Sequence, residues 1–323
     1  MKGKKLCAAA LALLLVLSGC STSSNVVKEG DKYVVAQVDG QNILADDVYE
    51  SLMTSASGKT VLFDYVLNQL INSKFPVTKD MEENAQTLID SIVTNYEYSY
   101  GSDYSLYLES DLAYEGYNSL DEYKEVLIDT LQYSEFLKAY VKANFDEIFD
   151  DYYKVESPRI VSIIHVAMSD VDKPTKDESA KKTEVENLLK TNKSFGEIAA
   201  SYSDDSSASA KGNLGIIDST KGLSSAYGED VEKKALALKE GETSDAIKGS
   251  DGYYYLHCTS TSKETIKKEL TSVDLDSPLL VYDAYLSYIA FNTYEIEFKD
   301  DAIKELIQSV VKEALDARKE IRG

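Results

Sequence analysis

The sequence predicts an α+β protein in which a small α/β domain is inserted into a mainly α-helical one. Apolar residues recur at intervals of three and four from Asp47 to Asn144 and again from Ala302 to Ile321, as in helices that bury one face. Between these stretches, Ile160 to Met168 and Gly252 to Thr259 are rich in β-branched or aromatic residues and read as strands. The two helical parts must therefore meet in space around the inserted unit.

Charge and composition limit the classes of function. The 323 residues hold 34 Lys and Arg against 56 Asp and Glu, a formal net charge of −22, which disfavours binding to the phosphate backbone of nucleic acid. Three Cys and two His are too few for a Cys/His-rich zinc site or an iron–sulfur cluster. No H-E-x-x-H or G-x-S-x-G string, typical of zinc proteases and serine hydrolases, occurs. We expect no nucleic-acid partner, no metal and no cofactor.

The N-terminus has the features of a bacterial lipoprotein signal. Three lysines precede the apolar run Leu6 to Leu17, which is shorter than the about 20 residues that a membrane-spanning helix needs. Small residues then lead to Cys20. We expect residues 1–19 to be a signal peptide and Cys20 to be lipidated. Residues 20–32 would tether the protein to the extracytoplasmic face of the bacterial cell membrane.

A short hairpin is predicted before the first helix. Tyr33 to Val38 alternates as a strand does, and Asp39-Gly40 suits a tight hairpin turn. Asp46 or Asp47 is expected to cap the helix that follows, because a carboxylate there can accept hydrogen bonds from the first free backbone N–H groups.

The predicted helical domain comprises residues 33–157 and 263–323. Its N-terminal part accommodates four or five helices, with breaks at Gly101 and Gly116. Half of the 24 tyrosines lie between Tyr96 and Tyr153. Amphipathic rings on acidic helices suit adaptable contact with polypeptide, although the same pattern also describes an ordinary core with solvated faces.

Residues 158–262 carry several short motifs in one order. The series reads IIHVAM from Ile163, SFGEIA from Ser194, YSDDSSA from Tyr202, GNLG from Gly212, GETS from Gly241 and GYYYL from Gly252. It resembles the parvulin family of peptidyl-prolyl isomerases, and an ordered series is far more specific than one short motif. With the lipoprotein signal and the flanking helices, the whole chain resembles foldase lipoproteins of the PrsA type, which are related to SurA.

This resemblance implies an isomerase that needs neither a nucleophile nor a metal. Rotation about a peptide bond has a barrier of about 18–20 kcal/mol. A pocket that holds the proline ring, excludes water and places a polar group near the twisting amide can favour the rotated state. The implied partners are unfolded or partly folded secreted polypeptides with X-Pro segments, and the membrane through the lipid on Cys20. Whether two copies pair as a homodimer stays open.

The resemblance also implies which residues form the site. His165 matches the first histidine of the family, Asp205 its acidic or thiol position and Leu214 an apolar pocket residue, and Met168 ends the first motif. On a strand from Ile160 to Met168, His165 shares a face with Val161 and Ile163 and so projects beside apolar neighbours.

Three positions depart from the family pattern. Ile217 stands where the family usually has phenylalanine, and Val231 falls near another aromatic position of the proline pocket. Tyr254 occupies the place of the second histidine. His257 cannot replace that histidine, because a shift of three residues along a strand reverses the face. We assign His165, Asp205 and Tyr254 to the catalytic cluster, and Leu214, Ile217, Val231 and Met168 to substrate binding.

Three functions follow from this sequence. The first is a membrane-anchored foldase whose parvulin unit isomerises X-Pro bonds. The second keeps the fold and location but has only chaperone activity, with the parvulin unit as a binding platform, and the three departures motivate it. The third, a solute-binding lipoprotein, requires two doubly wound lobes and is contradicted by the long helical flanks.

Overall fold

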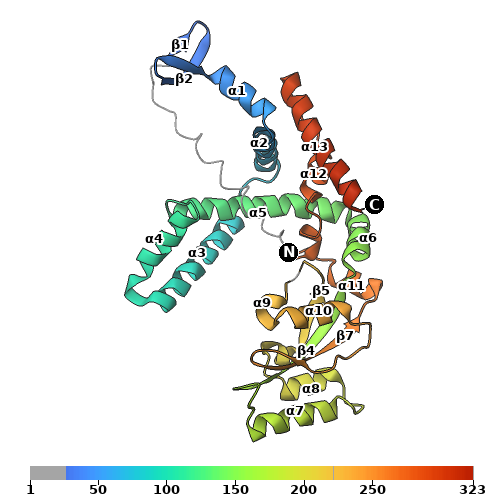
Figure 1. Ribbon diagram of the computed structural model, residues 1–323. Helices are drawn as coiled ribbons and strands as arrows, with labels where there is room; N and C mark the ends of the chain where they lie inside the picture. Colours follow the sequence, from blue (N-terminus) through green and yellow to red (C-terminus); the bar gives the residue numbers. More distant parts are fainter. Residues whose placement is uncertain (1–26, 221, 323) are drawn as a thin grey trace. The chain divides into compact units, whose positions relative to one another are not determined.

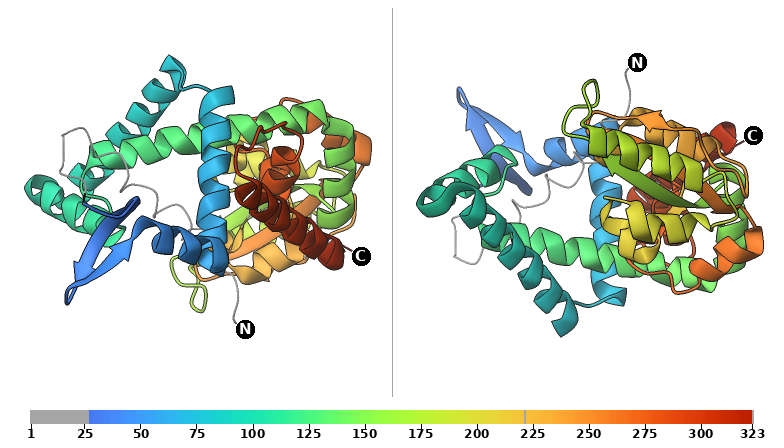
Figure 2. Two further views of the ribbon diagram at one scale, coloured as in Figure 1. Left: turned by 90° about the horizontal axis from the view of Figure 1, so that it is seen from above. Right: turned by 90° about the horizontal axis from the view of Figure 1, so that it is seen from below.

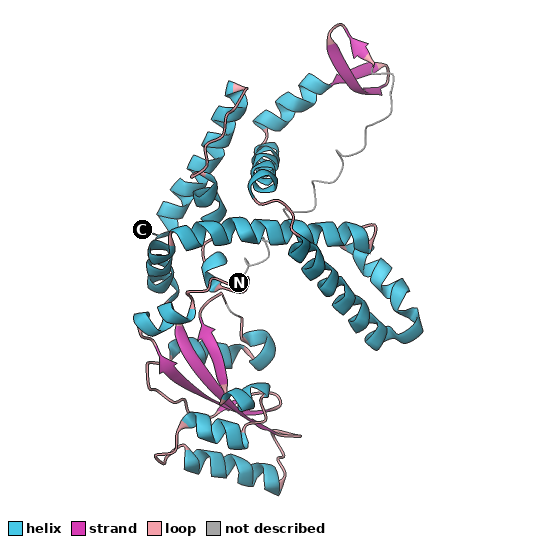
Figure 3. Ribbon diagram, turned by 180° about the vertical axis from the view of Figure 1, so that it is seen from behind, coloured by secondary structure: helices cyan, strands magenta, loops and turns pink. Residues whose placement is uncertain are grey.

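The computed structural model describes residues 27–220 and 222–322 (Figure 1). The chain divides into two compact units. One comprises the described residues up to Leu137 together with those from Tyr285 onward, and the other is the continuous segment Lys138–Ala284. The first unit is mainly helical and the second is a mixed α/β domain, as Figure 3 shows. The predicted α+β class, with an α/β domain inserted into a helical one, is confirmed.

The N-terminal segment is described only in part. Residues 1–19 and Cys20, for which a lipoprotein signal is predicted, lie outside the described residues. Strand β1 (Lys28–Glu29) falls within the segment 20–32 that is expected to act as a tether. Within the described ranges, no helix is long and apolar enough to cross a membrane.

The predicted hairpin opens the first unit. Strands β1, β2 (Lys32–Val38) and β3 (Gln41–Leu44) form an antiparallel sheet in that order. Asp39 and Gly40 both have positive φ, 49° and 83°, as a two-residue hairpin turn requires. The expected aspartate cap is wrong, because α1 (Ala45–Thr54) has Leu44 at its N-cap position. Asp46 and Asp47 lie in the first turn, where their negative charges interact favourably with the positive end of the helix dipole.

Five α-helices follow the hairpin in the N-terminal part, as predicted, and two complete the unit near the C-terminus. They are α1, α2 (Ala56–Lys74), α3 (Lys79–Tyr100), α4 (Tyr104–Tyr114), α5 (Leu120–Ala143), α12 (Leu286–Phe291) and α13 (Asp301–Arg322). Gly101 and Gly116 separate α3, α4 and α5 with φ of 56° and 93°, which confirms both predicted breaks. The 3₁₀ helix η1 (Gly101–Asp103) joins α3 to α4.

An aromatic cluster joins the two helical segments of the first unit. Phe63 on α2 is 1% exposed. Its ring stacks on Tyr288 of α12 at 4.7 Å between centroids and meets Phe291 edge-on at 5.0 Å. Phe136 on α5 is fully buried, and the centroid of its ring lies 5.9 Å from that of the Tyr294 ring. The segments before and after the inserted domain therefore meet in one core, as the sequence predicts.

The second unit is built on a four-stranded antiparallel sheet with the order β5-β4-β7-β6. Its strands are β4 (Arg159–Ala167), β5 (Asn213–Ile217), β6 (Ile247–Lys248) and β7 (Gly252–Ser260). Its helices are α6 (Phe145–Glu156), α7 (Lys176–Leu188), α8 (Phe195–Tyr202), η2 (Ser206–Ala210), α9 (Ser224–Tyr227), α10 (Glu229–Ala237), α11 (Lys263–Glu269) and η3 (Pro278–Leu280).

Alternation along β4 separates two apolar clusters. Val161 and Ile163 face the cluster that α9 and α10 complete. Ile164 and Val166 face the cluster beneath α7 and α8, and these two helices lie side by side in front of the sheet in the right panel of Figure 2. Both faces of β4 are thus buried, so its register is strongly specified.

A buried polar contact fixes α6 to the end of β5. The Tyr152 hydroxyl donates to Asp218 Oδ2 at 2.5 Å. Tyr152 is fully buried and Asp218 is 1% exposed. The same carboxylate accepts from the backbone N–H and the hydroxyl of Thr220 at 2.7 and 2.6 Å. Burial and the Asp218 carboxylate raise the pKa of Tyr152, so this phenol stays a donor.

We expect Tyr152→Phe to lower the free energy of unfolding by about 1–3 kcal/mol, because it removes a donor from a buried carboxylate. Urea unfolding of the full chain, followed by far-ultraviolet circular dichroism, measures this change. Tyr98→Phe is the matched control, because Tyr98 is 92% exposed, and it should leave the midpoint unchanged. Equal midpoints for the two variants would show that the Tyr152–Asp218 contact adds nothing to stability.

Candidate active site

The register of β4 and β7 places His165 opposite Tyr254. The two rings stack with 4.4 Å between centroids and an interplanar angle of 10°. The His165 side chain is 12% exposed and Tyr254 is 3% exposed. Tyr254 belongs to the apolar cluster that also contains Val161 and Ile163, so the predicted face of His165 is confirmed.

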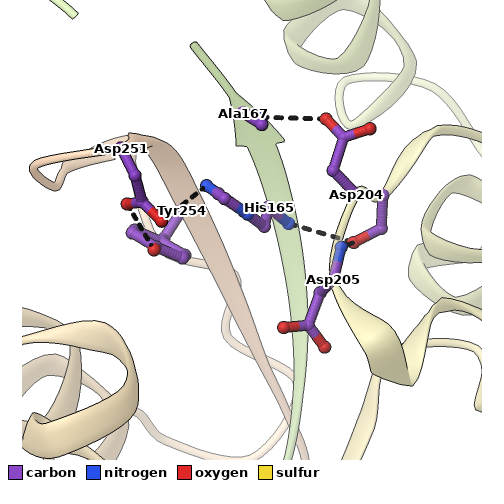
Figure 4. Close-up of polar contacts among 7 residues, drawn as sticks. His165, Ala167, Asp204, Asp205, Asp251 and Tyr254 are labelled. Atoms are coloured by element: carbon purple, nitrogen blue, oxygen red, sulfur yellow. Dashed lines mark hydrogen bonds and ion pairs between the residues drawn. The ribbon is translucent and has the colours of Figure 1, made fainter. Parts of the chain in front are cut away.

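Asp251 completes the polar end of this pair. The Tyr254 hydroxyl donates to Asp251 Oδ1 at 2.7 Å, and Asp251 Oδ2 lies 3.7 Å from His165 Nε2 (Figure 4). The second distance suits an ion pair if the imidazole is protonated, but it is too long for a hydrogen bond. Nε2 is buried and has no hydrogen-bond partner among the described residues. Burial and the Asp251 hydrogen bond raise the pKa of Tyr254.

The YSDDSSA segment lies on the other side of His165 (Figure 4). Ser203 Oγ accepts from the backbone N–H of His165 at 3.0 Å and of Asp205 at 3.2 Å. The backbone N–H of Asp204 donates to the His165 carbonyl at 2.8 Å. The Asp204 carboxylate accepts from the Ala167 N–H at 2.9 Å. These bonds fix the segment along the end of β4.

Asp204 and Asp205 have different electrostatic surroundings. Although burial raises the pKa of Asp204, its hydrogen bonds from Lys181, at 2.6 Å, and from Ala167 lower it overall. Asp205 accepts from the backbone N–H of Ser207 at 2.8 Å and thereby caps η2. Within the described chain, no hydrogen bond or ion pair joins the Asp205 carboxylate to His165. Asp205 is therefore placed beside the pair without contacting the imidazole.

Tyr227 connects Asp205 to the stacked pair. The Tyr227 ring, at the end of α9, meets Tyr254 edge-on at 5.8 Å between centroids. Burial and the Asp205 carboxylate raise the pKa of Tyr227 to about 12. Tyr227 was not predicted, because it falls in a segment whose register against the family pattern is unclear. Asp251 was also not predicted, and its only signal is its place directly before the closing GYYYL strand.

The apolar residues predicted to bind substrate differ in their exposure. Leu214 is half-buried and packs against the cluster that contains Tyr254. Ile217 is fully buried and Val231 is 1% exposed, so both lie within the core that supports the site. Met168 is 7% exposed, and its backbone N–H donates to the Asp251 carbonyl at 2.8 Å. Leu214 is the one of the four with substantial exposed surface.

His257 points away from this site, as the strand alternation predicts. Its ring stacks on Phe195 of α8 at 5.3 Å, on the opposite face of the sheet. Its Nδ1 lies 2.8 Å from Thr243 Oγ1. Burial lowers the pKa of His257. Among the described residues, no group of three or more His, Cys, Asp or Glu could hold a metal ion.

Two glycines provide the space for the pair. A Cβ atom at Gly252 would lie 2.2 Å from the Val166 carbonyl oxygen and 2.7 Å from His165 Nε2. A Cβ atom at Gly249 would lie 2.5 Å from Cε2 of Tyr254. Since contacts this short do not occur between real atoms, only glycine permits the observed packing of β4, β7 and the turn before β7.

Comparisons with known proteins identify the type of the inserted domain. Residues 164–260 match the family described as Rotamase: PPIC-type PPIASE domain. The inserted domain is therefore a peptidyl-prolyl isomerase domain of the parvulin type, as its motifs predict. The chain is 28% identical over 315 residues to the foldase protein PrsA of Bacillus subtilis (strain 168), covering 94% of this chain and 93% of that protein. The chain as a whole is thus a relative of the PrsA foldases.

Further relatives and solved structures carry the same name. The foldase protein PrsA of Staphylococcus aureus (strain Newman) is 26% identical over 318 residues, covering 95% of this chain and 92% of that protein. The crystal structure of PrsA from Bacillus subtilis has 25% sequence identity and a TM-score of 0.39, covering 84% of this chain and 97% of that chain. The crystal structure of foldase protein PrsA from Streptococcus pneumoniae str. Canada MDR_19A has 19% sequence identity and a TM-score of 0.40, covering 85% of this chain and 98% of that chain.

We expect Gly252→Ala to displace His165 from Tyr254, because the new methyl group would occupy the position of the imidazole edge and the Val166 carbonyl. Overpacking of this kind costs about 1–3 kcal/mol of unfolding free energy. Thermal unfolding and near-ultraviolet circular dichroism of the tyrosines measure the two effects. Gly222→Ala is the control, since nothing lies within 4 Å of its Cβ position. A Gly252→Ala protein as stable as the Gly222→Ala protein would contradict the packing described.

Proposed function

We propose that the site around His165 and Tyr254 catalyses cis–trans isomerisation of X-Pro bonds in unfolded polypeptides. The observation that carries this proposal is the stacked pair of rings, polarised at one end by Asp251 and bordered by apolar Leu214. The partly exposed His165 ring, stacked on the buried Tyr254 ring, and the half-buried Leu214 suit contact with a proline ring. Polar groups at the edge of an apolar surface suit a peptide bond that loses its resonance as it twists.

Each residue has a physical role in this proposal. The raised pKa of Tyr254 keeps its hydroxyl protonated, so the position of the family's second histidine still carries a donor. Asp251 holds that hydroxyl at 2.7 Å and orients the ring. His165 Nε2 is buried without a hydrogen-bond partner among the described residues, and we assign it the contact with the twisting amide, which requires it to become accessible when a peptide binds. The Asp205 carboxylate lies close enough to Tyr227 to raise the pKa of its phenol, and Tyr227 packs edge-on against Tyr254. Rotation itself requires no covalent step.

We expect His165→Ala to lower the isomerisation rate of an X-Pro peptide about tenfold or more, since a polar contact to the rotating amide is lost. Exchange NMR of the cis and trans signals of the peptide measures this rate without a coupled protease. Asp205→Ala should lower it through the displaced Tyr227. His257→Ala, on the opposite face, should keep the wild-type rate. Equal rates for the wild type and His165→Ala would rule out catalysis by this site.

The alternative function is a chaperone whose isomerase domain is catalytically weak. The observation that favours it is the direction of the Tyr254 hydroxyl, which donates to Asp251 and so is engaged. Tyr254→His distinguishes the two functions in the same NMR experiment. A silent wild type and an active Tyr254→His protein would assign chaperone activity alone. An active wild type would assign catalysis to a site that accepts tyrosine.

We also propose that the protein is anchored by lipid on Cys20 to the extracytoplasmic face of a bacterial membrane, where it assists the folding of secreted proteins. The basic and apolar residues before Cys20 support this proposal. Their removal would leave Cys20 as the first residue of the mature chain. Two or three acyl chains hold a protein on a membrane more firmly than one chain does.

Labelling with a clickable palmitate analogue tests the anchor. We expect the wild-type chain, expressed in a bacterium with its own lipoprotein pathway, to incorporate the label and to fractionate with membranes. Cys20→Ala should lose both the label and the membrane association. Cys258→Ala is the matched control, because Cys258 is a buried strand residue, and it should keep the label. A labelled Cys20→Ala protein would refute the assignment.

A further inference from the structure

A cavity of about 390 Å³ lies within the helical unit, away from the isomerase site. Helices α2, α5 and α12 line it, and its size falls in the range of pockets that hold a small group. Phe63, Tyr133 and Tyr288 supply aromatic surface. Its polar lining combines three carboxylates with amide and hydroxyl groups that can both donate and accept hydrogen bonds.

Three carboxylates give this cavity its charge. Asp64 is half-buried, whereas Glu125 and Asp129 are exposed at its rim. Among the described residues that line the cavity, none is a Lys, Arg or His. Burial raises the pKa of Asp64, and burial with the Glu125 charge raises the pKa of Asp129. The carboxylates therefore lack a cation of their own within the cavity.

A buried amide adds a further acceptor. Gln132 lines the cavity and is 2% exposed. Its Nε2 donates to the Phe75 carbonyl at 2.7 Å, which fixes the orientation of the amide. Oε1 receives no hydrogen bond from any described residue, and it is not enclosed away from solvent. Because this oxygen can be reached from the cavity, it can accept a hydrogen bond from a donor of a bound group.

The aromatic walls favour the same kind of group. Tyr133 and Tyr288 are half-buried, and burial together with the Asp64 charge raises the pKa of both phenols. Burial is the larger cause in each case. A cation is attracted both to the face of an aromatic ring and to a carboxylate. A planar guanidinium also carries several donors for the remaining oxygens.

We propose that this cavity binds a basic side chain, arginine before lysine, of an unfolded polypeptide held by the helical unit. The inference rests on the proposed function, because it names what the helical unit recognises in its clients. It predicts that the helical unit prefers client segments that contain a basic residue, which enters the cavity. The X-Pro bond is recognised by the separate isomerase domain.

Two fluorescein-labelled, unstructured 12-residue peptides test the proposal. One has a single central arginine, and the other has citrulline, which has nearly the same shape without the charge. Fluorescence anisotropy with the full chain measures both affinities at physiological salt. We expect wild type to prefer the arginine peptide about tenfold. Asp64→Asn with Asp129→Asn should bring the ratio close to one.

Asp90→Asn is the matched control for Asp129→Asn, because each removes one negative charge and Asp90 lies at an exposed position on α3, outside the cavity lining. Asp90→Asn should keep the preference for the arginine peptide. If the preference came only from the net negative charge of the chain, this variant would lose as much of it as a cavity variant does. If the double variant does not fold, Asp129→Asn alone still tests the proposal. It should reduce the preference for the arginine peptide about threefold. A wild-type ratio near one, or equal losses in Asp90→Asn and the double variant, would overturn the proposal.

The isomerisation rate of each preparation separates this proposal from the proposed function. The double variant should retain the wild-type rate on an X-Pro peptide, because neither aspartate belongs to the isomerase domain. An isomerase that binds both peptides equally would refute the cavity assignment and leave catalysis intact. Binding of neither peptide would refute the assignment as well, together with polypeptide binding by the helical unit.

Discussion

The antiparallel pairing of β4 with β7 is the constraint on which the rest of the α/β unit depends. It continues from Ile160 to Ala167 and sets His165 opposite Tyr254. Because both faces of β4 are buried, a shift by one residue would exchange the two apolar clusters. Gly252 allows the close approach at the end of the pairing. The position of the imidazole is therefore a consequence of the core.

The two faces of the sheet have separate functions. The face shared by Tyr254, Tyr227 and the apolar cluster carries the polar groups of the isomerase site. The other face packs against α7 and α8, and there His257 is a structural residue stacked on Phe195. Tyr254 places an aromatic ring and a hydrogen-bond donor opposite His165. The carboxylate of Asp251 accepts the hydrogen bond of the Tyr254 hydroxyl and orients the ring.

Much of this site could be predicted from local pattern. Alternation along one strand was enough to place His165, and a three-residue shift was enough to exclude His257. Asp251 and Tyr227 escaped prediction because their roles depend on contacts formed in the fold, across a turn and from a short helix. The pattern also could not show that the Asp205 carboxylate would cap η2 without a hydrogen bond to His165. At α1, the aspartate cap failed because the strand before the helix runs directly into Leu44.

The most direct test of this account is to map where an X-Pro peptide binds, using backbone amide chemical shifts of the full-length chain in solution. The account predicts that the largest changes fall on His165, Leu214, Tyr227 and Tyr254, on one face and one end of the sheet. The amide of Phe195, beneath the opposite face, should not move. Changes centred on α7 and α8, with none at His165, would contradict the assignment of the site.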